Sequence, residues 1–336
     1  SVSYAKARTK QLLDTWGNNM ETIQILQTIW FFLIGVLFIG YSILDGFDLG
    51  IGTLLPYFAR DKKDVISLFT AIGPVWDGNE VWLLTGGGAL FAAFPHVYAT
   101  VFSGFYLALM LVLFALIFRA VALEFWSLDE NRRTLWKWAF TVGSALPALL
   151  FGVALGNVLY GIPLNDKMEF TGNFFTLLRP YPLAIGLLGL SAILLQGCTY
   201  GALKIEGELH DRIVSSGKKI AIAYAALLGL SIITAFIVMP ERMGNIPAWI
   251  FTALVFIAVA AARTLLGKKS GLGSFIMSSI SFAGLWGIAG SIQFPNLVRA
   301  TEGGDLHLQI YNTSSSQLTL SVMLIIALIG MPIVIG

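Results

Sequence analysis

Charged residues are scarce in this sequence. Lysine, arginine, aspartate and glutamate together make up 12% of its 336 residues, and 57% are hydrophobic. An average soluble domain carries about 25% charged residues. The formal net charge is only +2, so a basic surface for nucleic acid is not expected. This composition excludes a soluble globular enzyme and a disordered chain, and it predicts no nucleic-acid partner.

Cysteine and histidine are scarce as well. Cys198 is the single cysteine, so an internal disulfide is excluded. The three histidines, His96, His210 and His307, are expected at helix ends or in loops. A haem buried in a helix bundle usually takes an axial histidine from the bundle wall. The sequence therefore predicts no haem ligand and no metal site in this chain.

Long apolar runs are what the sequence has in their place. A bilayer core of about 30 Å needs roughly 20 apolar residues per helix. The runs that qualify lie at about 25–45, 66–93, 97–125, 136–160, 180–204, 218–240, 246–267, 273–294 and 315–336. We expect an all-α, polytopic membrane protein in which residues 20–336 form a single transmembrane domain of nine helices. Residues 1–19 are a polar N-terminal segment of unclear origin and are set aside from the functional argument.

The basic residues are distributed unevenly between the two sides that nine spans would define. One side collects fourteen: Arg60, Lys62, Lys63, Arg119, Arg132, Arg133, Lys137, Lys204, Arg212, Lys218, Lys219, Arg263, Lys268 and Lys269. The other collects seven: Lys6, Arg8, Lys10, Lys167, Arg179, Arg242 and Arg299. By the positive-inside rule the first side is cytoplasmic. The N-terminus is then expected outside and the C-terminus in the cytoplasm.

Carboxylates near or inside the apolar runs are the most informative residues. An acid at the bilayer centre costs a helix on the order of 3 kcal/mol by insertion scales. Asp77 and Glu80 interrupt the second run, three residues apart, which places them on one helix face. Asn79 lies between them and extends this polar set. We interpret the set as a proton relay; the competing interpretation is a hydrogen-bonded plug that joins helices.

Other polar and aromatic residues have structural interpretations. Asp48 and Arg119 are expected to form a structural ion pair at the cytoplasmic interface, and Asp45 to cap a turn. Trp76 and Trp82 flank the acids of the second run. They could line a path for protons or O2, and packing explains them equally well.

Several motifs together resemble subunit II of the cytochrome bd-type quinol oxidases. They are Asp45-Gly-Phe-Asp-Leu-Gly50, Trp76-Asp-Gly-Asn-Glu-Val-Trp-Leu-Leu84, Gly87-Gly-Ala-Leu-Phe-Ala-Ala93, Phe102-Ser-Gly-Phe-Tyr106, Gly156-Asn157, Thr171-Gly-Asn-Phe-Phe175, Gly207-Glu-Leu-His210 and Ser315-Ser-Gln-Leu-Thr319. They occur in the family's order over about residues 22–336. The resemblance implies nine helices arranged as two four-helix bundles plus one peripheral helix.

The resemblance also implies an activity and partners. The family oxidises quinol with O2, forms water and takes protons from the cytoplasm, in a bacterial or archaeal cytoplasmic membrane. The haems, of b and d type or of b type alone, belong to subunit I, where quinol reacts. This chain would be the haem-free companion, not active alone, in contact with lipid and in some complexes with small single-helix subunits. Some members also hold a structural quinone in this subunit.

The resemblance also implies roles for individual residues. Asp77 matches a position in the proposed cytoplasmic proton route, and Asp48 and Arg119 match positions tied to complex integrity. Trp82 is similar to a residue near the proposed O2 path. Glu80 stands where some members have glutamine, so a second acid could join the route here.

The sequence thus predicts a subunit that scaffolds subunit I and conducts protons through Asp77. A secondary transporter or ion channel that uses the acids of the second apolar run is the alternative. No internal repeat supports the alternative.

Overall fold

The protein consists almost entirely of helices. The computed structural model describes residues 2–335, and side chains within 20–330; the side chains of the predicted polar segment 1–19 and Gly336 lie outside that description. The helices are α1 (Val2–Phe58), α2 (Lys62–Ile72), α3 (Trp76–Ala93), α4 (Pro95–Gly104), α5 (Tyr106–Leu128), α6 (Arg133–Tyr160), α7 (Pro180–Lys204), α8 (Gly207–Val238), α9 (Ile246–Gly267), α10 (Gly271–Gln293) and α11 (Gln317–Ile335). Two short strands, β1 (Asn296–Val298) and β2 (Leu308–Gln309), form an antiparallel pair.

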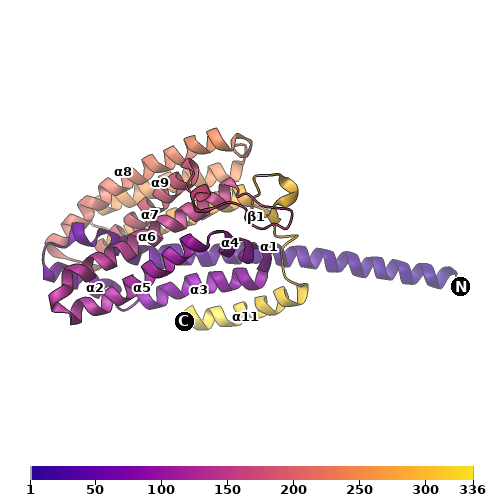
Figure 1. Cartoon of the computed structure of the whole chain (residues 1–336), viewed down its shortest axis with the longest axis horizontal. Coiled ribbons are helices and arrows are strands. Elements are labelled where there is room, and N and C mark those ends of the chain that lie inside the picture. The colour runs from indigo at the N-terminus through magenta and orange to yellow at the C-terminus, as the bar shows by residue number, and fades with distance from the viewer. Residues whose placement is uncertain (1, 336) are drawn as a thin grey trace.

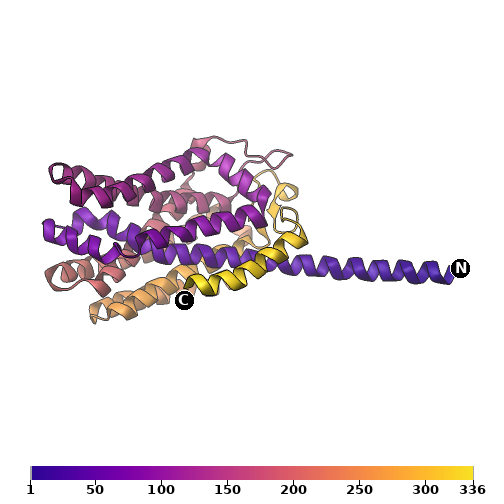
Figure 2. The same cartoon turned by 90° about the horizontal axis from the view of Figure 1, so that it is seen from below.

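Seven helices of the described part are long and apolar enough to cross a membrane. They are α1 and α5 to α10, with mean hydropathy between 1.5 and 2.5. Figures 1 and 2 show them side by side along one axis, with the N-terminal part of α1 projecting beyond the others. This confirms an all-α polytopic membrane protein.

The structure divides two of the segments that the sequence predicted as continuous helices. The segment 66–93 is broken into α2 and α3 by the turn Gly73–Val75. Pro74 accounts for the break, because proline has no amide hydrogen to donate to a continuing helix. The segment 97–125 is divided at Phe105 into α4 and α5. Here the loop 161–179 packs against the chain: a Cβ at Gly104 would lie only 2.8 Å from Phe170 Cβ.

Helix α1 is longer than predicted, and this moves its acids. The helix continues to Phe58 rather than ending near residue 45. At a rise of 1.5 Å per residue, Asp45 lies about 20 Å along the axis from Phe58, and Asp48 about 15 Å. Asp45 is therefore inside the helix. The expectation that it caps a turn is wrong.

Close helix crossings fix the centre of the bundle. A Cβ at Gly50 on α1 would lie 2.2 Å from the Ile193 carbonyl oxygen on α7, and one at Gly197 would lie 2.6 Å from α1 backbone. A Cβ at Gly143 on α6 would lie 2.6 Å from the Ala115 carbonyl oxygen on α5. Small residues of this kind let membrane helices approach closely. The crossings hold α1 against α7 and α5 against α6.

Two loops form a cap on one end of the bundle. Residues 161–179 and 294–316 meet where Ile162 pairs with Ala300. The Ala300 amide donates to His307 Nδ1 at 3.1 Å. Burial, helped by the charges of Arg299 and Arg242, lowers the pKa of His307. A neutral imidazole is required for Nδ1 to accept this hydrogen bond, so the environment of His307 and its role in the cap agree.

Candidate functional site

A buried cluster of ionisable and amide side chains lies where α1, α3 and α5 meet. We call Asp45, Asp48, Asn79, Glu80 and Arg119 the polar cluster. Asp45, Asp48 and Asn79 are buried, and Arg119 is among the largest fully buried side chains in the described part of the chain. The cluster holds three carboxyl groups and one guanidinium group.

Arg119 pairs with Asp45. Its Nη2 donates to Asp45 Oδ1 at 2.6 Å and its Nη1 donates to Asp45 Oδ2 at 3.1 Å. This two-pronged geometry is the strong form of an arginine–carboxylate contact. The sequence predicted Asp48 as the partner, and the described residues contain no Asp48–Arg119 ion pair. The predicted partner of Arg119 was the wrong acid. The sequence predicted that α1 would end near residue 45, so Asp45 was not considered as a residue inside the helix that faces α5.

Asp48 instead takes its hydrogen bond from α3. Asn79 Nδ2 donates to Asp48 Oδ2 at 2.8 Å and more weakly to the Leu44 carbonyl oxygen at 3.3 Å. The other carboxyl oxygen, Oδ1, is buried without a hydrogen-bond partner among residues 20–330. Asn79 thus joins α3 to α1, which is one function of the polar plug considered from the sequence.

Glu80 is the third acid of the cluster and its least confined member. Its Oε1 lies 3.5 Å from Arg119 Nη1, and a quarter of its side chain is exposed. The same oxygen has no hydrogen-bond partner in the described structure. Glu80 therefore interacts with Arg119 through charge alone, at longer range than Asp45 does.

Asp77 lies at the surface of α3 rather than in the cluster. It is exposed in the first turn of the helix. It makes no hydrogen bond or ion pair with the side chains described for residues 20–330. The sequence placed Asp77 and Glu80 together in a buried polar set, whereas in the isolated chain only Glu80 reaches Arg119. A carboxylate exposed beside apolar helices requires another molecule or water against this face.

The exposed face of α3 continues from Asp77 along the helix. Val81, Leu84, Gly88 and Phe91 are exposed at helical spacing from it. Gly87 and Gly88 are also open: a Cβ at either would meet nothing within 4 Å. We call the row Asp77, Val81, Leu84, Gly88 and Phe91 the α3 stripe.

The two tryptophans beside the acids are both half-buried. Trp82 packs on α1, because a Cβ at Gly40 would lie 2.3 Å from its Cε3 atom. Gly40 therefore makes room for the indole. Trp76 begins α3 at the turn that follows Pro74. These contacts account for packing and leave a path for O2 or protons along Trp76 and Trp82 as a prediction.

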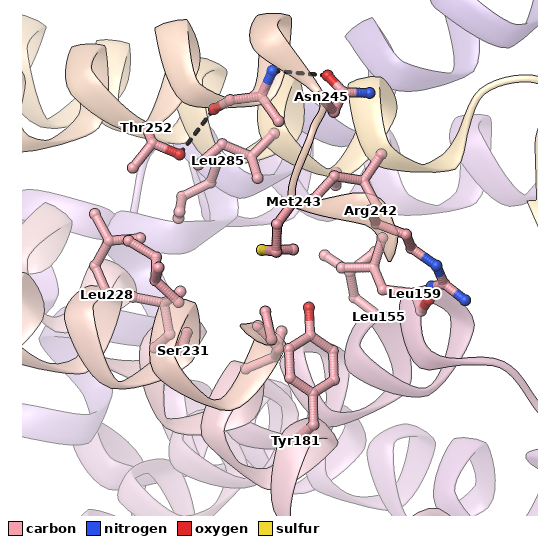
Figure 3. A pocket seen from close by; sticks show the side chains of 18 of the residues that line it. Leu155, Leu159, Tyr181, Leu228, Ser231, Arg242, Met243, Asn245, Thr252 and Leu285 are labelled. Atoms are coloured by element: carbon pink, nitrogen blue, oxygen red, sulfur yellow. Dashed lines mark hydrogen bonds between the residues drawn. The ribbon is translucent and has the colours of Figure 1, made fainter. Parts of the chain in front are cut away.

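A second feature is a pocket between α6, α7, α8, α9 and α10, near the loop cap. Its cavity volume is about 130 Å³, smaller than the roughly 300–1,000 Å³ of usual small-molecule sites. Most of its lining is aliphatic, including Leu155, Leu188, Leu228 and Leu285. Figure 3 shows Met243 projecting into it from the α8–α9 turn.

Tyr181 is the polar group aimed into this pocket. Its side chain is 4% exposed, and Figure 3 shows the hydroxyl pointing towards the centre of the pocket, near Met243. Within residues 20–330 the hydroxyl has no hydrogen-bond partner. Arg242, beside the pocket, is occupied: it donates to the carbonyl oxygens of Leu159 and Tyr160 at the end of α6. The pocket therefore offers an apolar wall and one free hydroxyl donor.

Sequence reasoning missed the roles of two of these residues, Asp45 and Tyr181. Asp45 could have been found from its spacing, since Tyr41, Asp45 and Asp48 follow one another at helical intervals if the helix is continued. Tyr181 carried no sequence signal, because its importance lies in a hydroxyl left unpaired by four other helices.

Comparison with known proteins gives consistent results. The family profile "Cytochrome bd terminal oxidase subunit II" matches residues 26–336. Cytochrome bd-I ubiquinol oxidase subunit 2 of Escherichia coli K12 is 35% identical, covering 94% of this chain and 93% of that protein. Cytochrome bd ubiquinol oxidase subunit 2 of Bacillus subtilis is 32% identical, covering 93% of each. A chain of the bd oxidase of Geobacillus thermodenitrificans shares the fold, with a TM-score of 0.78 at 16% identity over 93% of this chain and 96% of that one.

Proposed function

We propose a mechanism from the premise that this chain belongs to the cytochrome bd terminal oxidase subunit II family. As a member, it is a subunit of a quinol:O2 oxidoreductase and a multi-pass protein of the bacterial cytoplasmic membrane. Its partner is subunit I of the same oxidase. In the proposal, subunit I carries the haems, b and d or b alone, and oxidises quinol, while this chain scaffolds it and delivers cytoplasmic protons.

The proposed proton route runs along the first turns of α3. The carrying observation is an exposed carboxylate, Asp77, one helical turn from a second carboxylate, Glu80, that reaches the polar cluster. Asn79 holds this turn against α1 through Asp48. Asp77 would exchange protons at the surface that meets subunit I. Trp76 and Trp82 would wall the route or the path of O2 beside it.

Replacing Asp77 by asparagine should slow quinol-driven O2 reduction by roughly 10- to 100-fold, within or just below the range for removing a positioned proton-transfer group. Asparagine keeps the size and shape of the side chain, so the variant should still assemble. Oxygen uptake by the purified complex measures the rate, and the reduced-minus-oxidised haem spectrum measures assembly. The control is Glu208→Gln, which replaces an exposed acid on the proposed cytoplasmic side of α8. It should leave the oxygen-uptake rate and the haem spectrum unchanged. Loss of haem in Asp77→Asn would instead make Asp77 structural.

The proposed topology has nine crossings, in two four-helix bundles plus a peripheral helix. The nine crossings are the seven long helices, α11, and α2 together with α3, which count as one interrupted crossing. Basic turns support one cytoplasmic end: Lys62 pairs with Glu130, and Arg212 pairs with Asp64. Because these turns belong to alternate connections, the N-terminus is outside and the C-terminus inside in this proposal. Any small single-helix subunit would pack on the outside of this assembly.

The proposed ligand of the pocket around Tyr181 is a structural quinone. The pocket is apolar, as an isoprenoid tail requires, and its free hydroxyl can donate to a quinone carbonyl. Arg242 is already engaged by the end of α6, so the pocket favours a neutral headgroup over an anionic one.

Replacing Tyr181 by phenylalanine should lower the affinity for this quinone about fivefold, the effect of losing one hydrogen bond. Gly189→Leu should remove the quinone almost completely, because a Cβ there makes only an ordinary 3.5 Å contact with Gly152 and the rest of the side chain fills the pocket. Extraction and chromatography of quinone per complex measure the effect. Tyr224→Phe, a buried tyrosine bonded to Ser281, is the matched control. Equal quinone in all variants would place it elsewhere.

A further inference from the structure

We infer that Asp45 is a positioning residue: by holding the charge of Arg119, it leaves Glu80 free to exchange protons. The inference rests on the proposed proton route, in which Glu80 takes part. Asp45 itself would carry no proton. Its role would be to decide how strongly the one guanidinium group of the polar cluster acts on Glu80.

The contacts of Arg119 are unequal. Asp45 takes hydrogen bonds from both Nη1 and Nη2, at 3.1 and 2.6 Å. Glu80 Oε1 lies 3.5 Å from the same Nη1 and receives no hydrogen bond. The two acids therefore compete for one donor group, and Asp45 holds it.

The two acids also differ in their exposure to solvent. Asp45 is fully buried, whereas a quarter of the Glu80 side chain is exposed at the surface of α3. A proton can reach Glu80 from that side without passing through the packed interior. Asp45, closed in by α1 and α5, is suited to remain a fixed anion beside Arg119.

The remaining groups around Glu80 leave Arg119 as the decisive charge. Asp48 and Tyr41 face it from α1, and Asp77 lies one turn away on α3. None of these is a cation. If Asp45 lost its charge, the guanidinium group would be free to form a full ion pair with Glu80, because a small movement of the flexible glutamate side chain closes the 3.5 Å gap. Glu80 would then be held as a carboxylate and would stop accepting protons.

The test is the pH dependence of quinol oxidation by the whole complex. Asp45→Asn should move the alkaline limb of the rate profile to lower pH by about one unit, because a nearby opposite charge acting on one carboxylate produces shifts of this size. Asp45→Glu keeps the charge and should keep the limb near its original place. A purely structural role for Asp45 would lower yield or stability without moving the limb.

The decisive comparison repeats Asp45→Asn in a complex that already carries Glu80→Gln. In this variant the same Asp45→Asn change should no longer move the limb, because the acid on which Arg119 acts is absent. An unmoved limb in Asp45→Asn, or an equal movement with and without Glu80, would overturn the inference. If Glu80→Gln and Asp77→Asn both turn over at the original rate, the proton route itself fails. If Glu80→Gln is slow while Asp45→Asn leaves the limb unmoved, only the role of Asp45 fails.

A measurement on the unsubstituted complex covers the case in which Asp45→Asn does not assemble. Infrared difference spectra, with Glu80→Gln used to assign the band, report whether Glu80 is protonated. The inference requires that band to appear and disappear across the pH range in which the enzyme works. A Glu80 that stays ionised throughout would mean that Arg119 already holds it, and would overturn the inference.

Discussion

Replacing Arg119 by leucine should prevent stable assembly of the oxidase. Asp45 and Arg119 are both essentially inaccessible to solvent, and removal of one partner of a buried ion pair destabilises a protein by about 3–5 kcal/mol. Total stabilities are only about 5–15 kcal/mol, so this single change removes a large part. The yield of haem-loaded complex and its thermal unfolding in detergent measure the loss.

Two further variants separate charge from packing at this site. Lys62→Met removes a cation whose partner, Glu130, is largely exposed, and it should leave thermal unfolding nearly unchanged, because solvent and salt screen such pairs. Arg119→Leu combined with Asp45→Leu removes both charges and should recover part of the lost stability. An Arg119→Leu complex as stable as the original would show that the pair contributes nothing to integrity.

Replacing Gly88 by leucine should separate this chain from subunit I. We propose that subunit I packs on the α3 stripe, because the stripe combines an unpaired carboxylate with glycines that have open space above them. Small residues at such a face allow close approach of a second helix. A leucine there would overfill the contact at a cost of about 1–3 kcal/mol, which corresponds to roughly a 5- to 150-fold weaker association. Haem per molecule of this chain, after purification in mild detergent, measures the effect.

Gly229→Leu on α8 is the matched control for this prediction. A Cβ at Gly229 also meets nothing within 4 Å, so both substitutions are equally harmless within the chain. They differ only in the face of the protein that they enlarge. Full haem content in Gly88→Leu, or an equal loss in Gly229→Leu, would show that subunit I does not pack on the stripe.

The residue types by themselves determined much of this outcome. Long apolar runs with few charges can satisfy their backbone polar groups in a membrane only as helices, so the helices were predictable. The cost of an acid in such a run also identified Asp48, Asp77 and Glu80 as residues that require an explanation. The motif order then identified the family, which the comparisons confirm.

The tertiary structure decided how those acids are used. A hydropathy scale predicts that α1 ends near Asp45, because it counts each carboxylate as unfavourable in the membrane. It does not include the contacts by which Arg119 on α5 and Asn79 on α3 stabilise these carboxylates. In the fold the helix continues, so Asp45 rather than Asp48 meets Arg119, and Asp77 turns outward. The unpaired hydroxyl of Tyr181 likewise depends on the four other helices that surround it. Local sequence determines which segments are helical, whereas the partners of buried polar groups depend on contacts between residues far apart in the chain.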